Sequence, residues 1–180
     1  AYGQNDSAAI VDCLYLYREF SSEAVRILVP YTQAGMSETV LQSFMAALQL
    51  GLKRHYGGRV DHLRITTQKE PGEDGGPDRH YVLLYDSVPG GTGYLQQLLS
   101  EDAQTLTEVL KKAYDALRTC SCAASPDKDG CYRCLYQYRQ ARVLPSISRR
   151  EAEALLGDLL KNIDRLERLA KEVRRDVHKM

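Results

Sequence analysis

The sequence has 180 residues, of which 43% are apolar and 27% are charged, so its length and composition are those of one globular domain. Lys plus Arg and Asp plus Glu number 24 each, which excludes a strong overall attraction to nucleic acid and leaves only local patches. No stretch approaches the roughly 20 apolar residues of a membrane span, and none reads as a secretory signal. We therefore predict a cytoplasmic protein without a membrane contact. Because the sequence opens with Ala1 rather than Met, we expect a piece of a larger protein.

The first half of the chain predicts a small sheet with one helix. Four short apolar runs rich in β-formers predict strands at 13–17, 25–31, 60–67 and 80–86. After Ser37, apolar residues recur every three or four positions until Gly57 and Gly58, which predicts an amphipathic helix capped by Ser37. The glycine-rich stretch 69–77 predicts an exposed loop.

The second half of the chain is predominantly helical. Apolar residues at helical spacing cover 94–99 and 106–117, and a cysteine-rich segment follows directly. Ser148 and Glu151 match a capping box, in which each side chain satisfies the other's backbone N–H, so a long helix is expected to begin there. Its apolar positions step by three and four, as in a coiled-coil seam, and call for a partner surface. They are Ala152, Leu156, Leu159, Ile163, Leu166, Ala170, Val173 and Val177.

Four of the five cysteines lie within 15 residues, as two close pairs: Cys120, Cys122, Cys131 and Cys134. Two such pairs suit one tetrahedral Zn²⁺, and Gly130 allows the turn that brings the second pair round. Four thiolates leave no open position for water, so we predict one structural zinc per chain. Two alternatives stay open, an iron–sulfur cluster and a redox pair of Cys131 and Cys134. Cys13 stands apart and is expected to be a buried small hydrophobe.

Together these elements predict an α/β (α+β) fold, with a small mixed sheet of about four strands, packed helices, a four-cysteine zinc knot and a long C-terminal helix. We expect a single domain over 1–180. Within it, 1–118 form the sheet-and-helix core, 119–147 the zinc knot and 148–180 the C-terminal helix.

A glycine-rich turn separates the last predicted strand from the next helix, with the sequence Asp86-Ser-Val-Pro-Gly-Gly-Thr-Gly93. Backbone N–H groups before a helix favour anions, so Gly90, Gly91, Thr92 and Gly93 are candidate contacts for a phosphate or nucleic-acid backbone. No Lys-Ser or Lys-Thr follows the glycines, which excludes a nucleotide P-loop. The alternative is a tight turn in which Thr92 caps the helix and Asp86 bonds the loop backbone.

A second candidate contact surface is the basic segment 128–150, in which tyrosines interleave with cations. Arginines pair with phosphates and tyrosines stack on unpaired bases, which suits single-stranded DNA or a duplex edge. The candidate residues are Lys128, Arg133, Arg139, Arg142, Arg149 and Arg150, with Tyr132, Tyr136 and Tyr138. Arg149 and Arg150 lie in a first helical turn, where an external anion would offset the unfavourable dipole. The alternative is a solvated helix face with tyrosines packed beneath it.

The turn at 86–93 followed by the two cysteine pairs resembles the MrfA-type zinc-binding domain family, over roughly 25–160. That domain lies at or near the C-terminus of DEAD/DEAH-box superfamily 2 helicases and related proteins of DNA repair and phage defence. The resemblance implies zinc for the four clustered cysteines. By the same resemblance, the family's Asp and its Pro-Gly-Gly turn, which have no established chemical role, correspond to Asp86, Pro89, Gly90, Gly91 and Gly93.

We therefore expect a non-catalytic zinc-binding accessory domain that supports DNA binding or the architecture of a parent helicase. Its partners would be the helicase core or a partner subunit, and DNA. The sequence itself carries no ATPase motifs. One alternative is an interaction module that docks through the C-terminal helix without nucleic acid. Another is an enzyme acting at Asp86 with His80 nearby, but the sequence offers no nucleophile paired with a general base.

Overall fold

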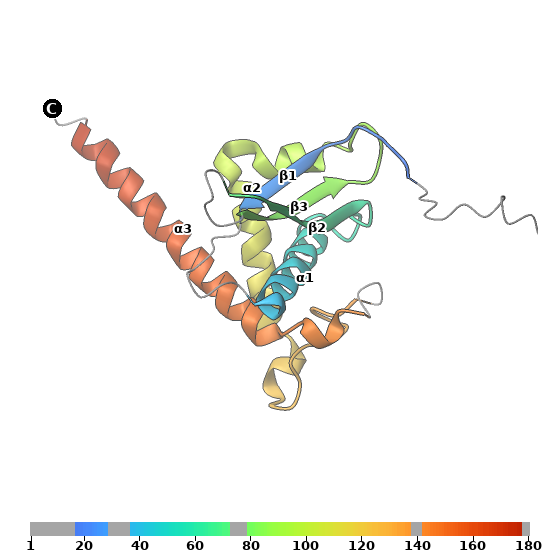
Figure 1. Ribbon diagram of the computed structural model, residues 1–180. Helices are drawn as coiled ribbons and strands as arrows, with labels where there is room; N and C mark the ends of the chain where they lie inside the picture. The colour runs from blue at the N-terminus through green and yellow to red at the C-terminus, as the bar shows by residue number, and fades with distance from the viewer. Residues whose placement is uncertain (1–16, 29–36, 73–78, 138–141, 178–180) are drawn as a thin grey trace, which may run out of the picture.

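The computed structural model describes residues 17–28, 37–72, 79–137 and 142–177, with backbone only at 101–102 and 167–177. Its main elements are β1 (Ala24–Leu28), α1 (Glu38–His55), β2 (Leu63–Glu70), β3 (Arg79–Asp86), α2 (Tyr94–Arg118) and α3 (Arg149–Val177) (Figure 1). Two short 3-10 helices, η3 (Ser121–Ala124) and η5 (Leu144–Ser146), lie between α2 and α3. The predicted α+β class is confirmed. The predicted strand at 13–17 lies outside the described residues, apart from Tyr17, and so does Cys13.

The described strands form one antiparallel sheet in the order β1-β3-β2. Among the described residues the sheet has three strands, and the fourth predicted strand, at 13–17, lies almost wholly outside them. Both described pairings are antiparallel, whereas a mixed sheet was predicted. In register, Val25 lies opposite Leu84 and Leu63 opposite Asp86. Alternate residues of β3, including Val82 and Leu84, are buried while their neighbours are partly exposed, as expected for a sheet that covers the core with one face.

The helices α1 and α2 pack closely because Gly51 lets their backbones approach. A Cβ added to Gly51 would lie 2.4 Å from the carbonyl oxygen of Val109 and 3.1 Å from the Cβ of Ala113, both on α2. At the start of α1, Ser37 accepts a hydrogen bond from the N–H of Val40 at 3.2 Å, as predicted for a cap. The first turns of α2 run in a different direction from the rest (Figure 1), and Ala103 at that point has a positive φ of 62°.

The helix α3 begins on the core and then extends away from it (Figure 1). Ser148 accepts from the N–H of Glu151 at 3.1 Å, which is half of the predicted capping box. The other half is absent, because the N–H of Ser148 donates to the Oγ of Ser43 on α1 at 2.8 Å. The start of the predicted seam is buried, with Leu156 fully covered, whereas Leu166 is 66% exposed. The last three predicted seam positions have no described side chains.

Candidate metal centre

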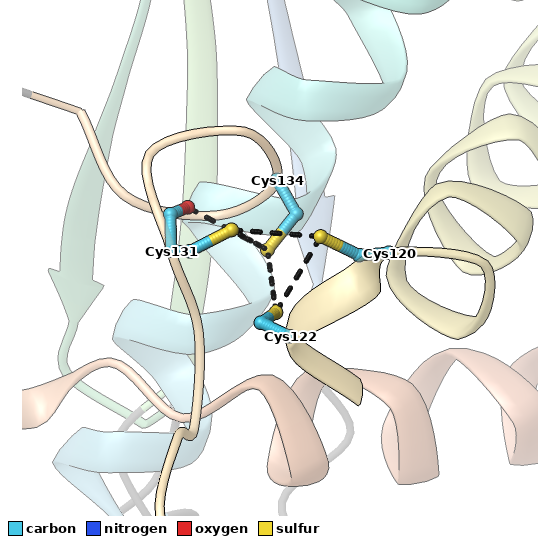
Figure 2. A group of neighbouring side chains, drawn as sticks. All are labelled: Cys120, Cys122, Cys131 and Cys134. Atoms are coloured by element: carbon cyan, nitrogen blue, oxygen red, sulfur yellow. Dashed lines mark hydrogen bonds between the residues drawn. The ribbon is translucent and has the colours of Figure 1, made fainter. Parts of the chain in front are cut away.

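Two tight turns after α2 bring the clustered cysteines together. In the first turn, the N–H of Ala123 donates to the carbonyl of Cys120 at 2.8 Å, and Cys122 follows within η3. In the second turn, the carbonyl of Cys131 accepts from the N–H groups of Cys134 and two further residues, at 3.0 to 3.1 Å. Figure 2 shows the sulfurs of both turns pointing toward a common centre.

The spacing of the sulfurs fits a single metal ion. Four Sγ···Sγ distances are 3.4 Å (Cys120 and Cys122), 3.5 Å (Cys120 and Cys131) and 3.7 Å (Cys134 to both Cys122 and Cys131). All four sulfurs lie within 4.8 Å of one another. Tetrahedral bonds of about 2.3 Å place thiolate sulfurs about 3.8 Å apart around Zn²⁺, whereas a disulfide needs about 2 Å. The four cysteines are free thiols at distances that suit one ion, and no disulfide joins them in this structure.

Burial shapes the acidity of these thiols. Burial raises the pKa of Cys134 above its ordinary range. Burial, together with the hydrogen bond that the Cys122 thiol donates to the sulfur of Cys120, raises the pKa of Cys122 to about 11. Burial also opposes ionisation of Cys131, but the N–H of Arg133 and the neighbouring thiols lower the pKa of Cys131 to about 7. A metal that binds here must displace protons, because thiolates are the ligating form.

Gly130 is required at the turn between the two cysteine pairs. Its φ is 140°, which side chains rarely adopt, and an added Cβ would lie 2.6 Å from the ring of Tyr136. The hydroxyl of Tyr136 in turn donates to the carbonyl of Asp129 at 3.3 Å. The predicted role of Gly130 in turning the chain is therefore confirmed, with the ring of Tyr136 as the second reason.

Asp129 joins the cysteine loop to α3, a role that the sequence analysis missed. Its carboxylate accepts from the Oγ of Ser148 at 2.6 Å and from the N–H of Arg150 at 3.0 Å. Its carbonyl accepts from the N–H of Arg149 at 3.0 Å. The anion at the start of this helix is thus supplied by the chain itself. An Asp-Gly pair between two cysteine pairs was the available signal, but it indicated only a turn.

The glycine-rich turn is organised by the buried carboxylate of Asp86. This carboxylate accepts from the N–H of Val88 at 2.8 Å, from the N–H of Thr92 at 2.9 Å and from the hydroxyl of Thr92. Burial of Asp86, which has no exposed surface, favours its neutral form, but these hydrogen bonds and the nearby His62 outweigh that effect and lower the pKa of Asp86. The predicted contact of Asp86 with the loop backbone is confirmed.

The N–H groups of this turn all donate within the chain. Gly90 donates to the carbonyl of Ser21 at 2.8 Å, Gly91 to the carbonyl of Val88 at 3.0 Å, and Thr92 to Asp86. Gly93 donates to the carboxylate of Glu23 at 3.2 Å. Gly93, with a φ of 83°, is itself the N-cap of α2, so the expectation that Thr92 caps this helix is wrong. Anion contact at Gly90 to Gly93 stays a prediction, although the backbone N–H groups that would bind the anion already donate to acceptors within the chain.

The histidine beside this turn is His62 and not His80. The Nε2 of His62 lies 3.1 Å from the Oγ1 of Thr92 and 3.9 Å from the carboxylate of Asp86. His80 lies within β3, opposite Lys69 of β2. The sequence offered no spacing that pointed to His62, because the contact joins residues 30 positions apart.

The cations of the predicted basic segment differ in exposure and in partners within the described part of the chain. Arg149 is 6% exposed and pairs with Glu153, so its guanidinium faces a carboxylate of its own helix. Arg150 is exposed and donates to the carbonyl of Pro126 at 2.6 Å. Arg133 and Arg142 are exposed, while Arg139 and Tyr138 lie outside the described residues. Within this set, Arg133 lies beside the cysteine cluster.

Comparison with known proteins finds a family match over the part of the chain that contains both the turn and the cysteine cluster. The family model of the MrfA Zn-binding domain matches residues 44–135, just over half of the chain, a span that contains the turn at 86–93 and all four clustered cysteines. Among solved structures, the chain resembles that described as the crystal structure of the DUF1998 helicase MrfA bound to DNA, with a TM-score of 0.52 and 17% sequence identity. The match covers 76% of this chain and 17% of that one, so this chain corresponds to about a sixth of it. No curated protein matches the chain.

These findings confirm the predicted family and the predicted zinc cofactor, because a zinc-binding family model coincides with a four-cysteine cluster that can hold one ion. The structural likeness supports the fold of the region. Among the described residues, no helix has both the length and the apolar character needed to cross a membrane.

Proposed function

Because the chain belongs to the MrfA Zn-binding domain family, we propose that it is a non-catalytic, zinc-stabilised accessory domain of a DEAD/DEAH-type helicase. Cys120, Cys122, Cys131 and Cys134 would hold one Zn²⁺ as thiolates. With four thiolates in place the ion has no open position for water, so it supplies cross-linking and not hydrolysis. The chain would act as one domain over 1–180, working beside ATPase motifs carried elsewhere in the parent protein.

The observation that carries this proposal is the position of the cysteine cluster in the fold. The first cysteine pair follows α2 directly, and the second pair follows Asp129, which holds the first turn of α3. Cys122, Cys134 and Leu135 are also part of the hydrophobic core. A metal at this point would therefore fix the end of α2 to the start of α3, as expected for a structural zinc.

The domain would support DNA binding or the architecture of the parent motor. The named structural relative is a helicase bound to DNA, and this supports the helicase core and DNA as partners here. We propose DNA repair or phage defence as the setting of such a parent, and the cytoplasm as its location. Unwinding itself would reside outside this chain.

Chelation of the purified chain tests the structural role. We expect amide hydrogen exchange to accelerate at the end of α2, through 119–137 and at the start of α3, with β1 to β3 remaining more protected. Equal protection with and without metal would contradict the proposal. In the same preparation the isolated chain should hydrolyse no ATP; hydrolysis that survives further purification would contradict the non-catalytic assignment.

A second candidate function, docking of a partner subunit through α3, is favoured by one observation. Leu166 of α3 is 66% exposed, and α3 extends away from the core toward its C-terminal end (Figure 1). Replacing Leu166 by Glu should abolish concentration-dependent association if that face docks. A chain that stays monomeric at high concentration and binds no apolar dye would count against this function.

A further inference from the structure

Two adjoining hollows lie on the outer side of the cysteine cluster. The first, of about 580 Å³, runs along α2 and is bordered by Arg54, Lys112 and Arg133. The second, of about 420 Å³, is bordered by Lys128, Tyr132 and Arg133. Arg133 and Ser121 line both hollows, so the two adjoin beside the metal site and together make up one depression.

This depression carries a local excess of positive charge on a chain with no net charge. Lys128 and Arg133 border the second hollow, with no carboxylate in its lining. In the first hollow, Asp115 is the one acidic residue against three cations. Among the residues that the structure describes, Arg54, Lys128 and Arg133 form no ion pair, although Arg149 and Arg118 nearby both pair with Glu153.

The charge of a loaded metal site offsets these cations only in part. Zn²⁺ with four thiolates carries a net charge of about −2. Four cations against this centre and Asp115 still leave a positive surface. The four cations are exposed, whereas Cys122 and Cys134 are buried. The competing explanation is that the cations serve only to neutralise the thiolates. In that case, removing the cations should cause loss of zinc.

We propose that this depression is a track that binds the phosphate backbone of a single-stranded nucleic acid, an inference that rests on the proposed structural zinc. Arg54, Lys112, Arg133 and Lys128 would contact successive phosphates. Tyr132, which is 53% exposed at the rim of the second hollow, offers an aromatic face on which an unpaired base can stack. Paired bases expose no such face, so the track favours a single strand over a duplex.

Fluorescence anisotropy with the zinc-loaded full chain tests the track. The probes are labelled oligothymidine and oligouridine of about 20 nucleotides and a duplex of the same length, each titrated at several salt concentrations. The double variant Arg54→Gln with Arg133→Gln removes two cations of the track. Its matched control, Lys161→Gln with Arg165→Gln, removes two exposed cations from α3.

The track variant should lower the affinity for single strands at least tenfold at low salt and reduce the slope of log affinity against log salt by about 1.4, because each phosphate contact contributes about 0.7. The control should stay within about twofold of the wild type. Tyr132→Ala should lower the affinity about fivefold or more, and Tyr132→Phe should retain it, because the phenyl ring still stacks.

The failures of the two proposals are distinguishable by metal content and melting temperature. A wild-type chain that lacks zinc overturns the proposed function on which the track rests. A folded, zinc-loaded chain that binds no single strand at low salt, or a track variant that binds like the control, overturns the track alone. Loss of zinc in the track variant favours the neutralising explanation and also overturns the track, whereas equal affinity for the duplex overturns its preference for single strands.

Discussion

Replacing Asp129 by Ala should loosen α3 from the cysteine loop. The variant loses two hydrogen bonds of the carboxylate, to the Oγ of Ser148 at 2.6 Å and to the N–H of Arg150 at 3.0 Å. Loss of a helix cap costs about 1 kcal/mol, and loss of a negative charge at a helix N-terminus costs roughly 0.3 to 1 kcal/mol. Because the carboxylate is half-buried, we expect a total loss of about 2 kcal/mol in the free energy of unfolding.

The assay is urea unfolding of the zinc-loaded chain, with zinc release to a coloured chelator as a second readout. A loss of 2 kcal/mol corresponds to a fall in Tm of about 4 to 8 °C for a chain of this size. The matched control is Asp127→Ala, because Asp127 is exposed, two residues away, and without a hydrogen bond or ion pair among the described residues. Zinc should leave the Asp129 variant faster than the control. Equal stability and equal release in the two variants would refute the role assigned to Asp129.

Three further predictions concern the packing, the glycine-rich turn and the metal ligands. Gly51→Ala should destabilise the chain by about 1 to 3 kcal/mol, because its Cβ would lie 2.4 Å from a carbonyl oxygen of α2. In the control Gly157→Ala the Cβ would lie 3.4 Å from Tyr114, so this variant should be neutral or stabilising by up to about 1 kcal/mol. Equal effects of the two substitutions in denaturant unfolding would contradict this prediction. Asp86→Asn should destabilise the chain by about 1 to 3 kcal/mol at pH 7. Because the pKa of Asp86 is lowered in the folded state, its contribution is complete above the unfolded value of 3.8 and is lost as pH falls through the folded value, so the difference from the wild type should shrink below about pH 4; a difference that is constant with pH would contradict the assignment. Cys131→Ser should lower bound zinc to well under one per chain, and a variant that retains one zinc would exclude Cys131 as a ligand.

The cysteine cluster could be predicted from the sequence because its information is local. Two close pairs separated by eight residues that include Gly130 can reach one ion without help from distant elements. The helix cap at Ser37 was predicted for the same reason, since the donor at Val40 lies three residues away. The three described strands were also predicted, because their alternating apolar residues face the core.

Contacts between distant residues could not be predicted in this way. Ser148 was expected to pair with Glu151 in both directions, yet its N–H finds Ser43, which is 105 residues away. Gly93 was treated as a free donor for anions, whereas Glu23, 70 residues away, accepts its hydrogen bond. In each case a tertiary acceptor satisfied a backbone group that local sequence left open.

The basic segment shows the same limit for charged side chains. Its cations were grouped by their order in the chain, but Arg149 is buried against Glu153 and Arg133 lies over the metal site. Arg133 shares the depression with Lys128 of the same segment, but also with Arg54 from α1 and Lys112 from α2. A charge pattern along the sequence does not reveal which cations share a surface once α1 and α2 pack side by side.

The most direct test of the central claim is the metal content of the purified chain, measured by elemental analysis with an absorption spectrum before and after chelation. One zinc per chain, no visible absorption and a marked fall in Tm after chelation are the results expected for a structural site of four thiolates. Iron with visible absorption would replace zinc by an iron–sulfur centre. An unchanged Tm after complete removal of the metal would contradict the claim that the ion fixes α2 to α3.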